Sequence, residues 1–147
     1  MKKIGLLMIG LLVFGQAELS RTDKGVVKDN DTKLEWQDSY EEDKFITYSW
    51  GGAINYCEAL NLEGKDDWRL PNINELKSIV LETQYAPSID TKFQNIRNDA
   101  YWSSTRTKYN SKKVWGVSFS DGMVFTPAYT FYNFRRPHYV RCVRGGK

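Results

Sequence analysis

The two cysteines constrain the fold of this chain more than any other feature of its sequence. Cys57 and Cys142 are the only cysteines, and they stand about 85 residues apart. A pair of this kind is expected to form a disulfide if the chain reaches an oxidising compartment. In the chain-entropy model, a bridge that closes so long a loop stabilises the fold by about 4–5 kcal/mol. We therefore predict a structural disulfide between Cys57 and Cys142.

The first residues predict export to such a compartment. Lys2 and Lys3 precede an uncharged apolar run from Ile4 to Phe14, and small residues lead to Ala17, as in a secretory signal peptide. The run is about 11 residues long, whereas a membrane-spanning helix needs about 20. A retained anchor is the alternative. We expect residues 1–17 to be removed and residues 18–147 to form one exported domain without a stable membrane anchor.

Charge is divided unevenly along this expected domain. From Glu18 to Thr91 the sequence has 8 Lys and Arg against 16 Asp and Glu, and from Lys92 to Lys147 it has 11 against 2. Such asymmetry can mark a surface for an anionic partner. Alternatively, the two halves interleave in space and neutralise each other.

The first half predicts a hairpin followed by a helix. Short β-prone runs at 26–27 and 34–36 flank the turn formers from Asp29 to Thr32. A calcium loop is disfavoured there, because regularly spaced oxygen ligands and a closing Glu are missing. Further on, Trp50, Ile54, Cys57 and Leu60 share one face of a helix, which Ser49 can cap and which we expect to end near Gly64.

The stretch "WRLPNINEL", residues 68–76, predicts a corner of the fold that leads into a second helix. Asn72 and Glu75 have the spacing of a capping box, and apolar residues continue behind them. Pro71 favours an extended conformation at Leu70. We expect a buried Trp68, with Arg69 on the opposite side, bonded to backbone carbonyls.

The second half has the pattern of strands. A strand is expected over 100–105, and a hairpin alternates Trp115, Val117 and Phe119 before an Asp-Gly turn at residues 121–122. The closing "HYVRCVR" predicts a last strand that carries Cys142, so the disulfide would join the first helix to it.

These motifs, with "EWQD", "AINYCEAL" and "YWSST", resemble the Legionella collagen-like protein C-terminal domain family over nearly the whole expected domain. The resemblance implies an α+β, C-type lectin-like fold, related to that of formylglycine-generating enzymes. It has two helices on a twisted antiparallel sheet and adjacent N- and C-terminal strands. It also implies that the stretch 68–71 is a framework motif. We assign the structural motif residues as Trp68, Arg69, Leu70, Pro71, Glu75, Trp102 and Trp115.

The resemblance implies less about function. The collagen-like parent is an adhesin whose terminal domain is associated with binding sulfated polysaccharides, but this chain lacks the collagen repeat. The Glu-Pro-Asn or Gln-Pro-Asp loop and the Trp-Asn-Asp strand of calcium-dependent lectins are also missing. Calcium-dependent sugar binding is therefore disfavoured.

Catalysis has little support in the sequence. The lone His138 has no second His, spare Cys or serine nucleophile motif to form a triad or a zinc site. Both cysteines are better used as a bridge. We expect no enzyme activity, no metal and no cofactor, with a degenerate enzyme relative as the remote alternative.

The segment "YTFYNFRRPHYVR", residues 129–141, is the most informative for binding, because it interleaves aromatic and basic side chains. Aromatic faces stack on sugars, and Arg pairs with sulfate, phosphate or carboxylate. Alternatively, the aromatics are core and the Arg residues are solvated surface. We predict an exported module, periplasmic, cell-surface or secreted, that binds an anionic glycan, or else an envelope protein in a structural or assembly role. Nucleic acid is an improbable partner for an exported chain, and the oligomeric state stays open. The candidate ligand residues are Tyr132, Arg135, Arg136, His138, Lys112 and Lys113.

Overall fold

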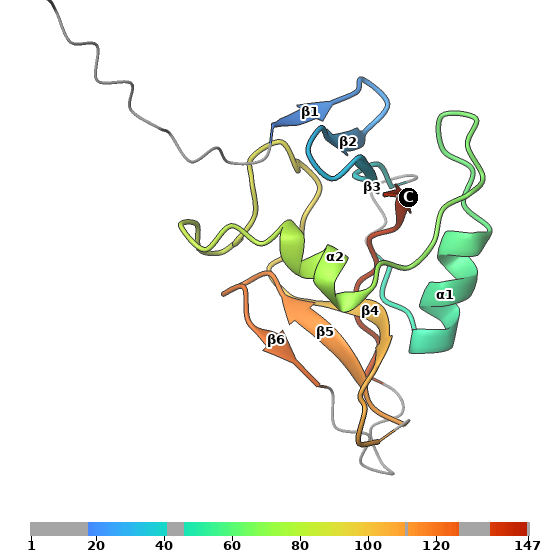
Figure 1. Ribbon diagram of the computed structural model, residues 1–147, viewed down its shortest axis with the longest axis vertical. Coiled ribbons are helices and arrows are strands. Elements are labelled where there is room, and N and C mark those ends of the chain that lie inside the picture. Colours follow the sequence, from blue (N-terminus) through green and yellow to red (C-terminus); the bar gives the residue numbers. More distant parts are fainter. Residues whose placement is uncertain (1–17, 41–45, 111, 127–135, 147) are drawn as a thin grey trace, which may run out of the picture.

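The computed structural model describes residues 18–40, 46–110, 112–126 and 136–146. The predicted signal peptide lies outside these ranges. The described chain is α+β, with two antiparallel sheets and two short helices (Figure 1). The predicted fold class is confirmed at this level, except that the strands form two sheets instead of one. The likeness to C-type lectin-like domains stays a prediction.

The first sheet gathers both ends of the described chain. Its strands are β1 (Leu19–Arg21), β2 (Val26–Asp29), β3 (Leu34–Gln37) and β7 (Val143–Gly145), in the order β1-β2-β3-β7. The predicted hairpin is confirmed as β2 and β3. Its turn is held by Asp29, whose Oδ1 accepts the amide hydrogens of Asp31 at 2.9 Å and Thr32 at 3.1 Å. The last strand pairs with β3, so it is not the neighbour of the first strand β1.

The second sheet contains β4 (Ala100–Arg106), β5 (Val114–Ser118) and β6 (Val124–Phe125), in that order. The predicted Asp-Gly hairpin is confirmed between β5 and β6. Gly122 has φ +77°, in the left-handed region that glycine adopts without strain. The strand expected over 100–105 is confirmed as β4.

Helix α1 (Trp50–Glu58) begins as predicted and ends early. The Ser49 hydroxyl accepts the amide hydrogen of Gly52 at 3.2 Å, which caps the first turn. The predicted extension toward Gly64 is wrong, because the chain reverses there in a tight turn. Glu63 and Gly64 both have positive φ, and Leu62 and Lys65 exchange backbone hydrogen bonds across them.

Helix α2 (Ile73–Ser78) starts with the predicted capping box. The Asn72 side chain accepts the amide hydrogen of Glu75 at 2.9 Å, and the Glu75 carboxylate accepts that of Asn72 at 3.4 Å. The apolar stripe continues past the helix: Ile79 is buried at the cap, and Val80 forms a β-bridge with Ile89.

The disulfide between Cys57 and Cys142 is present, and both residues are fully buried. It joins α1 to the residue just before β7, whereas the sequence pattern placed Cys142 within the strand. The core has two parts. One surrounds the disulfide and includes Trp68 and Trp102, and the other lies under α2 and includes Trp36 and Phe119.

Candidate functional site

The stretch Trp68 to Pro71 forms a corner of the fold. Trp68 is 2% exposed and donates its indole hydrogen to the Lys65 carbonyl at 3.0 Å. The Arg69 guanidinium pairs with the Glu75 carboxylate at 2.8 Å and donates to the Gly145 carbonyl at 3.2 Å. Arg69 also exchanges backbone hydrogen bonds with Val143. These contacts fix the start of α2 against β7, which is a structural role.

Trp102 and Trp115, the other predicted motif residues, lie in the second sheet. Trp102 is buried, and its indole donates to the Tyr48 carbonyl at 2.7 Å. The Trp115 carbonyl accepts the hydroxyl hydrogen of Ser103 at 2.7 Å, which links β5 to β4. Both residues therefore have contacts that stabilise the fold.

Four of the six candidate ligand residues lie in the described part of the chain. Tyr132 and Arg135 lie outside the described ranges, as does most of the aromatic and basic segment. Arg136 is exposed. Lys112 and Lys113 lie in the turn between β4 and β5, where Lys112 is exposed and Lys113 is half-buried.

The His138 side chain is half-buried and packs against aromatic residues. Its ring lies edge-on to Trp102, with centroids 4.5 Å apart, and to Phe125, at 5.7 Å. Burial lowers the pKa of His138, and the charge of Arg136 lowers it further against the opposite influence of Asp99. The imidazole is therefore mainly neutral near pH 7 and contributes little positive charge to an anion site.

Arg141, which the sequence groups with the basic segment, is fully buried. It donates to an Asp38 carboxylate oxygen at 2.7 Å and to the Gln37 carbonyl at 2.6 Å, and its guanidinium lies 4.8 Å from the centre of the Phe93 ring. Arg144 of β7 pairs with Glu35 of β3 and with Asp67, which precedes Trp68. These two arginines of the basic half are thus neutralised by the acidic half, as the interleaving alternative proposes.

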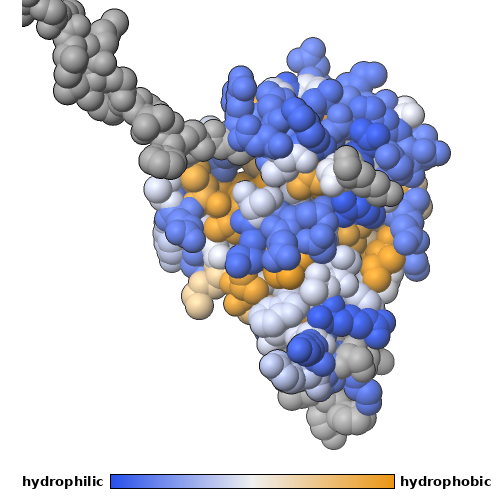
Figure 2. Space-filling view, in the orientation of Figure 1, coloured by the Kyte–Doolittle hydropathy of each residue, from blue (hydrophilic) through white to orange (hydrophobic). Residues whose placement is uncertain are grey.

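The basic residues around the β4–β5 turn have a different setting. Arg106, Lys108, Lys112 and Lys113 lie within eight positions, and no acidic residue occurs from Ala100 to Ser120. We call these four residues the basic turn. In Figure 2 the coloured atoms at the lower end of the molecule, where β4 and β5 turn in Figure 1, are white to blue, that is, intermediate to hydrophilic. The basic turn therefore gives this end of the molecule a positive charge.

The backbone of the basic turn is well supported. The Thr107 amide donates to the Lys113 carbonyl at 2.8 Å, and the Lys113 amide donates to the Asn110 carbonyl at 2.9 Å. The Arg106 guanidinium lies 4.9 Å from the centre of the Trp50 ring. Tyr109 stands at the tip and is 96% exposed. The prediction from sequence included Lys112 and Lys113 but missed Arg106, Lys108 and Tyr109, which the acid-free run could have indicated.

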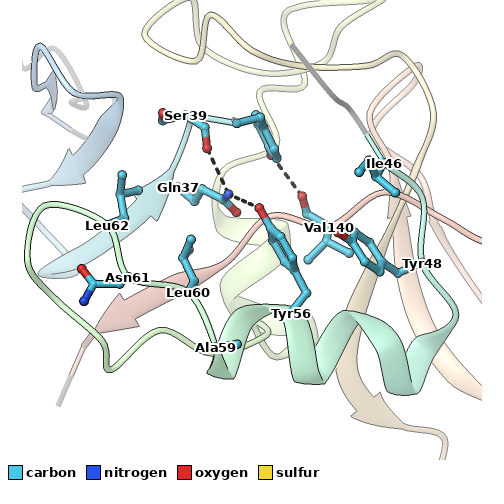
Figure 3. Close-up of a pocket in the computed structure, with 11 residues that line it drawn as sticks. Gln37, Ser39, Ile46, Tyr48, Tyr56, Ala59, Leu60, Asn61, Leu62 and Val140 are labelled. Atoms are coloured by element: carbon cyan, nitrogen blue, oxygen red, sulfur yellow. Dashed lines mark hydrogen bonds between the residues drawn. The ribbon is translucent and has the colours of Figure 1, made fainter. Parts of the chain in front are cut away.

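A pocket of about 640 Å³ lies beside α1, and its lining residues do not include any residue of the basic turn (Figure 3). The pocket is lined by side chains from several segments: Gln37, Ser39, Tyr40, Ile46, Tyr48, Tyr56 of α1, Val140 and the residues 59–62. The Tyr48 and Tyr56 rings are 5.0 Å apart between centroids. Burial raises the pKa of Tyr40 well above its ordinary value, so its phenol is neutral. No pattern in the sequence indicated this pocket.

Within the described part of the chain, no group of three or more His, Cys, Asp or Glu side chains could hold a metal ion. The described helices are also all too short to cross a membrane.

Comparison with known proteins gives one result. The sequence model of a family described as Lcl C-terminal domain matches residues 25–144, which is most of the chain. No curated protein matches the chain.

Proposed function

Because the chain belongs to the Lcl C-terminal domain family, we propose that it is an exported, non-catalytic domain that binds an anionic polysaccharide. The observation that carries this proposal is the basic turn, four cationic residues at one end of the molecule in a stretch without acidic residues. The ligand would be a glycan of the envelope or extracellular space.

The chemistry of the basic turn suits a sulfated or carboxylated chain. Lys and Arg attract such groups over several ångströms, and Arg pairs with them through two parallel hydrogen bonds. The Trp50 ring holds the Arg106 guanidinium, which lowers the entropic cost of binding. Tyr109, 96% exposed, offers an aromatic face beside the lysines. Arg136, outside this turn, is a further exposed cation.

Export is supported by the disulfide between Cys57 and Cys142, because such bonds persist in oxidising compartments. The basic and hydrophobic start of the chain has the pattern of a signal peptide. The periplasm, the cell surface and the medium are all compatible with both observations.

The proposal is tested by measuring the binding of heparin, chondroitin sulfate and neutral dextran at low and at physiological salt. We expect heparin binding that weakens steeply with salt, since several exposed cations would contact the ligand. The double variant Lys108→Glu, Lys113→Glu should bind about tenfold more weakly, because each exposed ion pair contributes up to about 1 kcal/mol.

The matched control is Lys24→Glu, Lys92→Glu, which changes the net charge equally at two exposed lysines away from the turn. Its heparin affinity should stay close to that of the parent chain. Equal losses in both double variants would indicate attraction by net charge alone and would refute a site at the turn. A third variant, Arg136→Glu, tests whether the site extends to that residue.

A second candidate function is supported by two exposed apolar side chains. Tyr85 is 78% exposed and Met123 is 64% exposed, and a hydrogen bond between Ala86 and Ser120 brings their two loops together. Such a surface suits a structural or assembly protein that holds an envelope protein partner. Partner binding of this kind should be insensitive to salt and should be lost in Tyr85→Ser.

A further inference from the structure

The pocket beside α1 differs in chemistry from the basic turn. Its volume of about 640 Å³ lies within the usual range for small-molecule sites. Tyr48 and Tyr56 form an aromatic wall, and Leu60 and Leu62 add an aliphatic side (Figure 3). The described residues that line it include no charged side chain. An ion entering this pocket would lose hydration without gaining a counter-charge from these residues.

The polar groups of the pocket are held by buried contacts. The Gln37 side chain, fully buried, donates its amide hydrogens to the Tyr56 hydroxyl at 2.7 Å and to the Ser39 carbonyl at 3.0 Å. Its carbonyl oxygen accepts the amide hydrogen of Cys142 at 3.3 Å, next to the disulfide. The phenol of Tyr56 therefore has a fixed place, which favours affinity because little is left to order on binding.

Asn61 also lines the pocket, and its exposed amide adds a neutral polar group at the rim. The pocket thus combines flat aromatic and aliphatic walls with neutral hydrogen-bonding groups. The described lining residues suit a ligand with an apolar face, a rim of hydroxyl or amide groups and no charge.

We propose that this pocket binds a single neutral sugar residue. A pyranose ring presents C–H groups on its faces and hydroxyls around its edge, which matches tyrosine rings next to amides and phenols. The proposal goes beyond the anionic site and does not depend on it, because the pocket lies apart from the basic turn and takes an uncharged ligand.

The test uses the chain expressed from its full sequence, labelled with nitrogen-15. Methyl glycosides of glucose, galactose, mannose and N-acetylglucosamine are titrated separately while amide resonances are recorded by NMR. We expect at least one glycoside to cause saturable shifts at Tyr48, Tyr56 and Asn61, with no effect of salt.

Three variants locate the binding site. Ala59→Trp fills the pocket from its exposed rim and should abolish the shifts, whereas Asn74→Trp, at an exposed position of α2, should leave them unchanged. Asn61→Ala removes only an exposed amide and should weaken binding about tenfold. It serves as the second readout if the Ala59→Trp variant is unfolded.

Other results would overturn the proposal. Shifts with p-cresol but with none of the glycosides would assign the pocket to apolar aromatics instead. Shifts with glucuronic acid alone would show that the pocket binds an acidic ligand instead of a neutral sugar. Absence of shifts with every glycoside would show that no sugar occupies the pocket. Loss of heparin binding in the lysine variants would not affect any of these outcomes.

Discussion

The buried ion pair of Arg141 and Asp38 shows that the role of a residue in the structure can differ from the role that its sequence neighbours indicate. Arg141 stands among aromatic and basic residues, yet its side chain is fully buried against Asp38. Asp38 is also buried and accepts the amide hydrogens of Gln94 at 2.9 Å and Asn95 at 3.2 Å, besides its pairing with Arg21. The pair therefore joins the end of β3, the loop before β4 and the segment before β7.

Replacing Arg141 with Met should be strongly destabilising. The substitution leaves the Asp38 carboxylate buried with one fewer partner, and breaking such a pair costs about 3–5 kcal/mol. Urea unfolding monitored by tryptophan fluorescence measures the loss. As a control, Arg136→Met at an exposed position should change the free energy of unfolding by less than about 0.5 kcal/mol. A loss below about 1 kcal/mol for Arg141→Met would contradict the structural role given to the pair.

His138 should make stability depend on pH. Its pKa in the folded state is lowered from the ordinary value of 6.5 by burial, so the unfolded chain takes up the proton first as the pH falls. The stabilisation is thus complete above about pH 6.5 and is lost below it. Melting temperatures between pH 7.5 and pH 5 should fall, and His138→Gln should flatten this fall.

Above pH 5 the change in stability reports the titration of His138, because it is the only histidine in the sequence. The lowered pKa values of the Glu35, Asp67 and Asp121 carboxyls place their titrations at lower pH. An equally steep loss of stability in His138→Gln would assign the pH dependence to another group.

Among the elements, α2 depends most clearly on a local signal. Removing the Asn72 side chain leaves the amide of Glu75 without its cap, so Asn72→Ala should cost about 1 kcal/mol in the free energy of unfolding. Asn74→Ala, at an exposed position within the helix, provides the matched control and should be neutral or slightly stabilising. Equal effects in the two variants, measured by urea unfolding, would argue against the capping box.

Elements defined by local signals could be predicted from the sequence, and those defined by distant contacts could not. The cap at Asn72, the Ser49 cap and the Asp-Gly hairpin depend on residues within a few positions of one another. The pairing of β7 with β3 and the division into two sheets depend on contacts across most of the chain. The early end of α1 follows from a turn at Glu63 and Gly64 that the helical pattern does not reveal.

The same distinction holds for the candidate sites. Lys112 and Lys113 could be predicted as part of a basic surface, because charge is visible in a sequence. The burial of Arg141 could not be predicted, because its hydrogen-bond acceptors belong to Gln37, Asp38 and Asn95, which are far away along the chain. The pocket beside α1 was missed for the same reason, since its walls come from separate segments.

At the scale of the whole molecule, the disulfide joins two parts of the chain that lie far apart in the sequence. Cys57 and Cys142 are separated by 85 residues, and the loop between them contains α2 and the entire second sheet. Both cysteines lie in the part of the core that also contains Trp68 and Trp102. The bond thus restricts most of the unfolded chain, while the folded core is already packed around it.

Replacing both cysteines with Ala should therefore lower the free energy of unfolding by about 4–5 kcal/mol, the value that chain entropy gives for a loop of this length. This is a large share of the roughly 5–15 kcal/mol that stabilises an ordinary domain, so the double variant should melt at a much lower temperature. Urea unfolding of the parent chain with and without reductant gives a second measure that involves no substitution. A loss below about 1 kcal/mol in both experiments would show that packing around α1 and β7 holds the fold without the bond. The pocket and the basic turn would then be expected to keep their shapes in a reducing compartment as well.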